Sequence, residues 1–330
     1  MDINSKENVL RAIERRHPLR VPLSYCNRDL DSSDVIGVGA GQDPAFKPAC
    51  PGQSEWGFVW RSHDKTMGQP IDAPLADWDR SGCYVPPDPL ARGRFDHWPD
   101  FLAANRHRFV KAGLGISGFN LATFLRGFEA FLEDFYTQRE RAEHVLDLVF
   151  GFENALIDAY CAQPVDGVGF ADDWGTQQNL MISPALWREV FRPRYAAQFE
   201  RIHRAGKKVW FHSCGDVSAI LGDLIDSGVD VLELLQPDIF GIERLASQYG
   251  GRVCFCCSVD HQRRAVSGTR DEIFDYARRL NDRLGCFDGG FIGYIEDYAS
   301  LGMSEQNYQW IREAFRGLTV PAAVPSRMKA

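Results

Sequence analysis

The spacing of apolar residues predicts an alternation of strands and helices over most of the chain. After residue 119, short apolar runs of strand length alternate with longer segments in which apolar residues recur at helical spacing. The predicted strands are 165–171, 208–212, 229–235, 252–258 and 291–295. The predicted helices are 121–135, 139–161, 183–203, 217–226, 242–248, 270–284 and 305–315. Such an alternation is typical of a parallel sheet covered by helices.

The N-terminal third has a different pattern. Residues 4–15 are predicted to form a short amphipathic helix, and residues 20–23 a first strand. Residues 37–94 are rich in Gly, Pro and Trp and show little periodicity. An irregular segment of this length is uncommon inside a compact domain and is usually functional. We therefore interpret 37–94 as a cap over a pocket.

The alternation continues without a linker and favours one domain, an α/β fold of the (β/α)₈ TIM-barrel type over residues 1–320. The tail, 321–330, is expected to be disordered. A doubly wound sheet is the alternative. That fold usually has a glycine-rich phosphate turn after its first strand, and the pattern G-x-G-x-x-G does not occur in this sequence.

Charge and composition narrow the function classes. The formal net charge of −8 argues against nucleic acid or an anionic membrane as the main partner. The chain has no run of about 18 apolar residues, as a membrane helix needs, and residues 1–10 lack the apolar core of a signal peptide. The nine cysteines are scattered and odd in number, so we expect reduced thiols and a cytoplasmic location. The expected partner is a small-molecule substrate.

Polar side chains follow five consecutive predicted strands, at the point where each strand ends. They are Asp172, Asp173, Trp174, Thr176 and Gln177; then His212, Ser213, Cys214 and Asp216; then Gln236 and Asp238; then Ser258, Asp260, His261 and Gln262; then Glu296 and Asp297. In a barrel, catalytic groups come from these carboxyl ends and from the loops that follow them. The sequence therefore predicts an active site around His212, Cys214 and the Asp172–Asp173 pair.

His212 and Cys214 suit zinc, because imidazole nitrogen and thiolate are both preferred ligands of that metal. The alternative is a buried histidine and cysteine in a tight turn at Gly215. A zinc site needs further ligands, and the candidates at neighbouring strand ends are Asp173, Cys257, Glu296 and Asp297. In the run 254–257, alternate residues face opposite sides of a strand, which indicates barrel packing for most of these cysteines.

The two aspartates could form a general acid–base or metal-binding pair, or one of them could cap the following loop. We expect Asp173 to take part in catalysis. Asp77, in the predicted cap, could close over the site, although a solvated loop residue is the alternative. Expected substrate contacts are Trp56, Trp174, Gln177, Gln236 and Asp260. Trp56, Trp60, Trp78 and Trp174 could line an apolar pocket or simply pack.

Several segments resemble the uroporphyrinogen decarboxylase superfamily, in particular its methyltransferase-like branch. The matching stretches run in order along nearly the whole chain: 55–57, 74–77, 125–127, 172–177, 182–184, 212–215, 228–230, 259–262, 289–292 and 305–307. The resemblance implies a (β/α)₈ barrel. True uroporphyrinogen decarboxylases use an arginine-rich motif of the R-Q-A-G-R type near the N-terminus. Residues 21–28 read VPLSYCNR and lack it, which disfavours that reaction.

The other branch resembles zinc-dependent methyltransferases that exchange methyl groups with a corrinoid, often carried by a partner protein. Its ligands are H-x-C and a later cysteine. His212 and Cys214 match, whereas Asp297 stands where the later cysteine is expected. The resemblance thus implies zinc held by His212, Cys214 and Asp297. A carboxylate is a harder ligand than a thiolate, which allows a different metal.

Three hypotheses follow. The first is zinc-assisted alkyl or methyl transfer on a small molecule, with a corrinoid or thiol partner. The second is a metal-free decarboxylase or lyase, in which Asp77 or Asp173 stabilises charge. The third is a non-catalytic module that binds a small molecule or a corrinoid.

Overall fold

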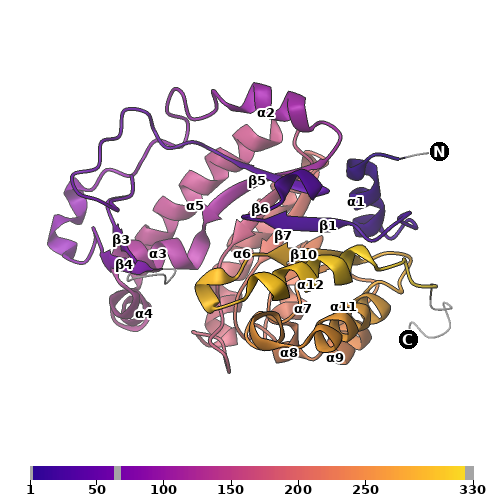
Figure 1. Cartoon of the computed structure of the whole chain (residues 1–330). Coiled ribbons are helices and arrows are strands. Elements are labelled where there is room, and N and C mark those ends of the chain that lie inside the picture. Colours follow the sequence, from indigo (N-terminus) through magenta and orange to yellow (C-terminus); the bar gives the residue numbers. More distant parts are fainter. Residues whose placement is uncertain (1–2, 63–67, 324–330) are drawn as a thin grey trace.

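The computed structural model describes residues 3–62 and 68–323 and contains a barrel of eight parallel strands. The strands lie in the order β1-β10-β9-β8-β7-β6-β5-β2, and helices surround them (Figure 1). Their bounds are β1 Leu23–Cys26, β2 Val35–Gly39, β5 Phe109–Ile116, β6 Gly167–Ala171, β7 Lys208–His212, β8 Val231–Leu234, β9 Cys254–Cys257 and β10 Phe291–Glu296. This confirms the predicted (β/α)₈ architecture.

The helices are α1 Ser5–Glu14, α2 Trp98–Asn105, α3 Gly118–Arg126, α4 Phe128–Thr137, α5 Arg139–Cys161, α6 Pro184–Arg204, α7 Leu221–Ser227, α8 Pro237–Phe240, α9 Ile242–Tyr249, α10 Arg264–Ser267, α11 Arg270–Leu284 and α12 Glu305–Arg316. Short 3₁₀ helices span Leu30–Ser32, Trp78–Cys83 and Ala299–Leu301. A small antiparallel hairpin, β3 Val59–Arg61 and β4 Gln69–Asp72, lies outside the barrel. No described helix is long and apolar enough to span a membrane.

The barrel closes between β1 and β2 largely through side chains. Tyr25 N donates to Ser33 Oγ at 2.9 Å, and Leu23 N donates to Asp34 Oδ2 at 2.9 Å. Asp34 N in turn donates to the carbonyl of Leu23 at 2.8 Å. Because Ser33 and Asp34 satisfy backbone groups that a strand ladder would otherwise pair, they join the first strand to the second.

The interior of the barrel holds a core of its own, filled by alternate residues of the strands. Trp210, Cys254, Cys256 and Ile292 are fully buried there. Helix α1 covers the end of the barrel at which the strands begin, and its residue Ile13 joins this inner core. Phe255 and Cys257 belong to the outer core between strands and helices. The predicted alternation of faces across 254–257 is thus confirmed.

The segment 37–94 was predicted as a cap, and three of its tryptophans pack on the flank formed by α3 and α5. Trp56 meets Phe152 of α5 with ring centroids 4.8 Å apart, and Trp78 meets His144 of the same helix at 5.7 Å. Trp60 contacts Phe124 of α3 at 5.8 Å. The hairpin β3–β4 lies on the side of the molecule opposite the two termini (Figure 1).

The structure differs from the predicted elements in several places. Residues 37–39 belong to barrel strand β2 rather than to an irregular segment, and β5 was not predicted. The first strand spans 23–26 instead of 20–23. The helix predicted over 121–135 is divided into α3 and α4 at Gly127, whose φ of 87° is left-handed and cannot continue a helix. Of the tail 321–330, residues 324–330 lie outside the described chain.

Candidate active site

A cavity of about 540 Å³ opens at the carboxyl ends of the barrel strands. Its ionisable lining residues come from six strands or the loops after them: Lys111, Asp173, His212, Cys214, Glu233, His261, Tyr294, Glu296, Asp297 and Tyr298. Glycines at 113, 115 and 169 and the side chains of Phe170, Leu235 and Leu301 complete much of the wall. A concave site with a largely apolar lining and several convergent polar groups, at this end of a barrel, is typical of an enzyme active site.

Two neighbouring loops bring Asp173, His212 and Cys214 together. Ala171, the last residue of β6, is paired with His212, the last residue of β7, so the chain leaves both strands at the same height. Cys214 N then donates to Asp173 Oδ1 at 2.7 Å. The carboxylate of one loop is therefore held by the backbone of the other.

Close contact between these loops depends on Gly175 and Gly215. The φ of Gly215 is +78°, and a Cβ atom there would lie 2.0 Å from the carbonyl oxygen of Gly175. Any side chain at 215 would clash with backbone and would also be strained in this left-handed conformation. The glycine after His-x-Cys is thus a requirement of the site's geometry.

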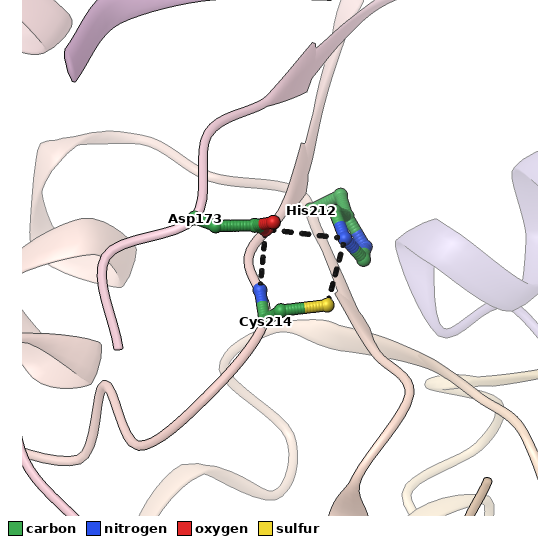
Figure 2. Close-up of side chains that lie close together, drawn as sticks. All are labelled: Asp173, His212 and Cys214. Carbon is green, nitrogen blue, oxygen red and sulfur yellow. Dashed lines mark hydrogen bonds and ion pairs between the residues drawn. The ribbon is translucent and has the colours of Figure 1, made fainter. Parts of the chain in front are cut away.

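The donor atoms of Asp173, His212 and Cys214 all lie within 4.8 Å of one another (Figure 2). His212 Nε2 is 3.4 Å from Asp173 Oδ1 and 3.4 Å from Cys214 Sγ. The other ring nitrogen, Nδ1, is 3.2 Å from Glu233 Oε1, an ion-pair distance, although the ring is not aligned for a full hydrogen bond. The imidazole thus lies between two carboxylates and beside a thiol.

This arrangement shifts the protonation equilibria. Burial alone would lower the pKa of His212, but the interactions with Asp173, Cys214 and Glu233 raise it well above its ordinary value. Burial alone would raise the pKa of Asp173, but the hydrogen bond to His212 lowers it. In the absence of a metal, the site therefore favours an imidazolium flanked by carboxylates.

Glu233 is the centre of a second layer behind His212. It lies opposite His212 in the β7–β8 register, and its Oε2 accepts from Trp210 Nε1 at 2.6 Å and Lys111 Nζ at 3.3 Å. Burial alone would raise the pKa of Glu233, but the charges of Lys111 and His212 keep it below the ordinary value. Glu233 is therefore an anionic support for the histidine ring.

The wall across the cavity consists of residues from β9, β10 and β1 or from the loops after them. Glu296 accepts from Asn27 Nδ2 and from Tyr294 Oη, each at 3.0 Å. Burial raises the pKa of Glu296. Burial and the charge of His212 lower the pKa of His261 to about 4, so that this imidazole is neutral near pH 7.

Asp297 and Asp77 lie apart from the three donors. Asp297 lines the cavity but forms an ion pair with Arg28, whose Nη1 is 3.3 Å away, and its atoms are not among the clustered ones. Asp77 caps the 3₁₀ helix Trp78–Cys83 by accepting from Asp79 N at 3.1 Å. It is exposed and does not line the cavity.

The five predicted substrate contacts also lie outside the lining of the cavity. Trp56 and Trp174 are buried in aromatic clusters, and the ring of Trp174 stacks on Phe119 at 4.4 Å. Gln236 accepts from Gly215 N at 3.2 Å and donates to Gln177 at 3.3 Å, so both glutamines brace the loops. Asp260 is buried and accepts from the backbone nitrogens of 262 and 263.

Asp172 points away from the cavity and anchors the loop from behind. It is fully buried, and it accepts from the backbone nitrogens of Phe119 and Asn120 at 2.9 Å each and from Tyr195 Oη. The Asn120 side chain in turn accepts from Asp173 N at 2.6 Å. The two adjacent aspartates thus have different environments, and Asp173 is the one that faces the site.

Lys111 and Glu233 were missed because they lie within strands rather than after them. Lys111 belongs to β5, which was not predicted, and Glu233 interrupts the apolar run 231–235. A charged residue in a buried barrel strand is rarely tolerated without a partner. The glutamate within the apolar run 231–235 therefore indicates a buried, paired carboxylate, and the sequence could have predicted this.

Comparisons with known proteins agree with this architecture. The family model described as uroporphyrinogen decarboxylase (URO-D) matches residues 92–292, more than half of the chain. Among solved structures, a methyltransferase from Methanosarcina mazei aligns with a TM-score of 0.72 and 16% identity, covering 96% of this chain and 99% of that one. At this identity the likeness concerns the fold.

A 3-keto-D-glucoside 4-epimerase from E. coli aligns less well, with a TM-score of 0.42 and 14% identity over 68% of this chain and 85% of its own. No curated protein sequence matches significantly. The eight-stranded barrel, the site at its carboxyl end and the matched family model lead to one conclusion: the chain belongs to the uroporphyrinogen decarboxylase family.

Proposed function

We propose that this chain is an alkyltransferase, most simply a methyltransferase, that holds zinc between Asp173, His212 and Cys214 and acts on a small molecule. The observation that supports this best is the convergence of a thiol, an imidazole and a carboxylate within 4.8 Å at the cavity wall. A catalytic zinc site typically has three protein ligands and one open position. The name of the Methanosarcina mazei structure supports the reaction class by analogy.

The donor set fits zinc. Thiolate and imidazole favour it over harder cations, and a carboxylate completes many catalytic sites. Asp173 replaces Asp297 as the proposed third ligand, because Asp297 pairs with Arg28 and lies outside the cluster. Glu233 supports His212 from behind, as carboxylates commonly do for a metal-bound histidine. Bound zinc would supply a Lewis acid that activates a coordinated nucleophile.

The residues around the proposed zinc site have different roles. Asp173 is oriented by Cys214 N, so ligand geometry is preset by the loop contact. Lys111 balances the charge of Glu233, which keeps that carboxylate ionised next to the histidine. A corrinoid, on a partner protein, is the proposed methyl donor or acceptor; it rests on the family resemblance of His212 and Cys214.

Zinc content tests the proposal. Purified protein should contain about one zinc per chain after mild chelation, measured by elemental mass spectrometry, and His212→Ala, Cys214→Ser and Asp173→Asn should lose it. Asp297→Asn is the matched control, since it removes a carboxylate from the same cavity but not from the donor cluster, and it should keep the metal. Zinc that survives Asp173→Asn and disappears in Asp297→Asn would reverse the ligand assignment. A metal-free wild type would contradict the proposal.

The family's name suggests a second candidate, decarboxylation of uroporphyrinogen. The cavity disfavours it because four carboxylates, those of Asp173, Glu233, Glu296 and Asp297, line the wall, and Lys111 there is already paired with Glu233. A substrate with many carboxylates would meet like charges at close range. We expect no conversion of uroporphyrinogen to coproporphyrinogen above the rate without enzyme, measured by chromatography of the oxidised products. Conversion at an ordinary enzymatic rate would support the decarboxylase instead.

A further inference from the structure

The carboxylates that line the cavity differ in how their charge is balanced. Asp173 and Glu233 lie beside His212, Glu233 also pairs with Lys111, and Asp297 pairs with Arg28. Glu296 accepts hydrogen bonds from two neutral groups, the amide of Asn27 and the hydroxyl of Tyr294. Among the described residues no ion pair of Glu296 is found. Glu296 thus lacks an ion-pair partner in this part of the chain, and the charge of His212 acts on it only from a distance.

A second observation points to a ligand at the same wall. His261 is 7% exposed and lines the cavity, and its Nδ1 has no hydrogen-bond partner in the described part of the chain. Its ring lies edge-on to Tyr298, with centroids 5.0 Å apart. Buried polar atoms are nearly always paired in folded proteins. An unpaired one at a cavity indicates that a polar ligand group completes the site.

We propose that this wall, formed by Glu296, Tyr294 and Tyr298, binds the alkylated ammonium group of the substrate. The inference rests on the proposed function, because it identifies the substrate class for the transferase cavity. A carboxylate flanked by aromatic rings attracts an organic cation both by charge and by interaction with the rings. The apolar lining from Phe170, Leu235 and Leu301 suits the alkyl substituents of such a group.

Other ligand classes fit less well. An anion at this wall would meet the carboxylates of Glu296 and Asp297, and the cavity's Lys111 is already paired with Glu233. A hard metal ion prefers six or more oxygen ligands, whereas Glu296 has an amide nitrogen and a phenol hydroxyl already donating to it. A neutral alcohol would leave the charge of Glu296 unbalanced. A tertiary or quaternary ammonium compound satisfies both the charge and the apolar surroundings.

The test compares three probes of nearly the same shape by isothermal titration calorimetry. Choline carries the cation, 3,3-dimethyl-1-butanol is its neutral counterpart, and 3,3-dimethylbutyrate is an anionic one. The full-length wild type should bind choline at least about tenfold more tightly than the alcohol and should bind the anion most weakly. Equal binding of choline and the alcohol, tighter binding of the anion, or no binding of choline would overturn the inference without any variant.

Two isosteric variants then locate the effect. Glu296→Gln should abolish the preference for choline over the alcohol, whereas Asp297→Asn, which removes the same charge from the same cavity, should retain most of it. If both variants lose the preference for choline equally, the preference comes from the overall negative charge of the cavity, and the assignment of Glu296 is contradicted. Thermal unfolding and zinc content establish that each variant is folded and metalated like the wild type.

The same measurements separate this inference from the proposed function. If the wild type binds zinc but shows no preference for choline, the proposed substrate class is contradicted and the proposed transferase function is unaffected. If the wild type prefers choline but contains no zinc, cation binding is confirmed and the proposed zinc site is contradicted.

Discussion

At the scale of single residues, the chemistry of the site depends on the residues that support the proposed metal ligands. His212 can coordinate a metal through Nε2 only if its ring is held in one orientation. Glu233 Oε1, 3.2 Å from Nδ1, is the group that can hold it. Outer carboxylates of this kind typically contribute about 10- to 100-fold to metal affinity.

We therefore expect Glu233→Gln to weaken zinc binding about 10- to 100-fold while leaving the three ligands in place. Competition with a chromophoric chelator measures the affinity. Asp238→Asn is the control: Asp238 lies in α8, just after the strand that carries Glu233, and pairs with Arg264 outside the cavity. An affinity unchanged by Glu233→Gln would mean that Glu233 has no role in orienting the histidine.

At the scale of elements, α5 carries a buried carboxylate that supports the start of α3. Glu153 accepts from Gly118 N at 2.6 Å and from Gln198 Nε2 at 2.9 Å. The buried Gln198 Oε1 has no hydrogen-bond partner among the residues that the structure describes. Burial raises the pKa of Glu153 to about 7 from 4.5. Between these values the folded state holds a proton that the unfolded state has released. Stability therefore falls as the pH rises from about 4.5 to about 7.

Glu153→Gln should remove this dependence. At pH 8 the variant should be more stable than the wild type, by up to about 3 kcal/mol, because a neutral amide avoids ionisation in the core. Near pH 5 the two should be nearly equal. Urea midpoints at both pH values measure the difference, with Glu140→Gln, an exposed position on the same helix, as the control. A variant that is less stable than the wild type at pH 8 would show that the carboxylate is favourably charged.

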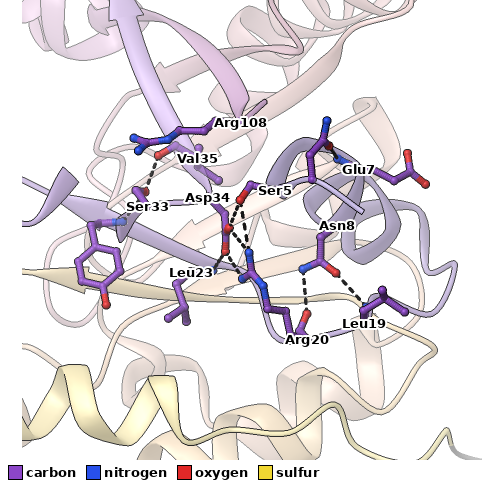
Figure 3. Close-up of polar contacts among 12 residues, drawn as sticks. Ser5, Glu7, Asn8, Leu19, Arg20, Leu23, Ser33, Asp34, Val35 and Arg108 are labelled. Carbon is purple, nitrogen blue, oxygen red and sulfur yellow. Dashed lines mark hydrogen bonds and ion pairs between the residues drawn. The ribbon is translucent and has the colours of Figure 1, made fainter. Parts of the chain in front are cut away.

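At the scale of the whole molecule, the barrel depends on the junction between its first two strands. Asp34 is 4% exposed and forms an ion pair with Arg20, while Ser5 of α1 donates to it at 2.5 Å (Figure 3). The same carboxylate accepts from Leu23 N of β1. Asp34 thus joins α1, β1 and β2 at the end of the barrel remote from the cavity.

Asp34→Ala should destabilise the fold by about 3 kcal/mol, because it leaves a buried backbone N–H unpaired and an arginine without its partner. Asp34→Asn should cost less, since its amide oxygen can still accept from Leu23 N. Hydrogen exchange should show faster opening of β1 and β2 in the alanine variant, and Asp31→Ala, at an exposed site, should behave like the wild type. Equal stability of all three variants would mean that backbone contacts alone close the barrel.

Much of the architecture could be predicted from the chain alone. The helix over 139–161 and the strand over 208–212 agree with α5 and β7, because long amphipathic periodicity and short apolar runs are local properties. The strands β2 and β5 were missed or misplaced since glycines and a lysine interrupt their apolar pattern. Interior barrel positions tolerate such residues only because of neighbours that are distant in sequence.

The order of residues along the chain was enough to predict the barrel, the end at which the site lies and two of the three clustered donors, since residues that follow strands must meet at one rim. The remaining features depend on tertiary contacts. Whether Asp173 or Asp297 joins His212 and Cys214 depends on which carboxylate is already paired, and Arg28 holds Asp297. Asp172 and Asp173 are adjacent in the chain, yet one is buried behind the loop and the other faces the cavity. Partners, burial and charge balance arise from contacts between distant segments, and sequence spacing does not specify them.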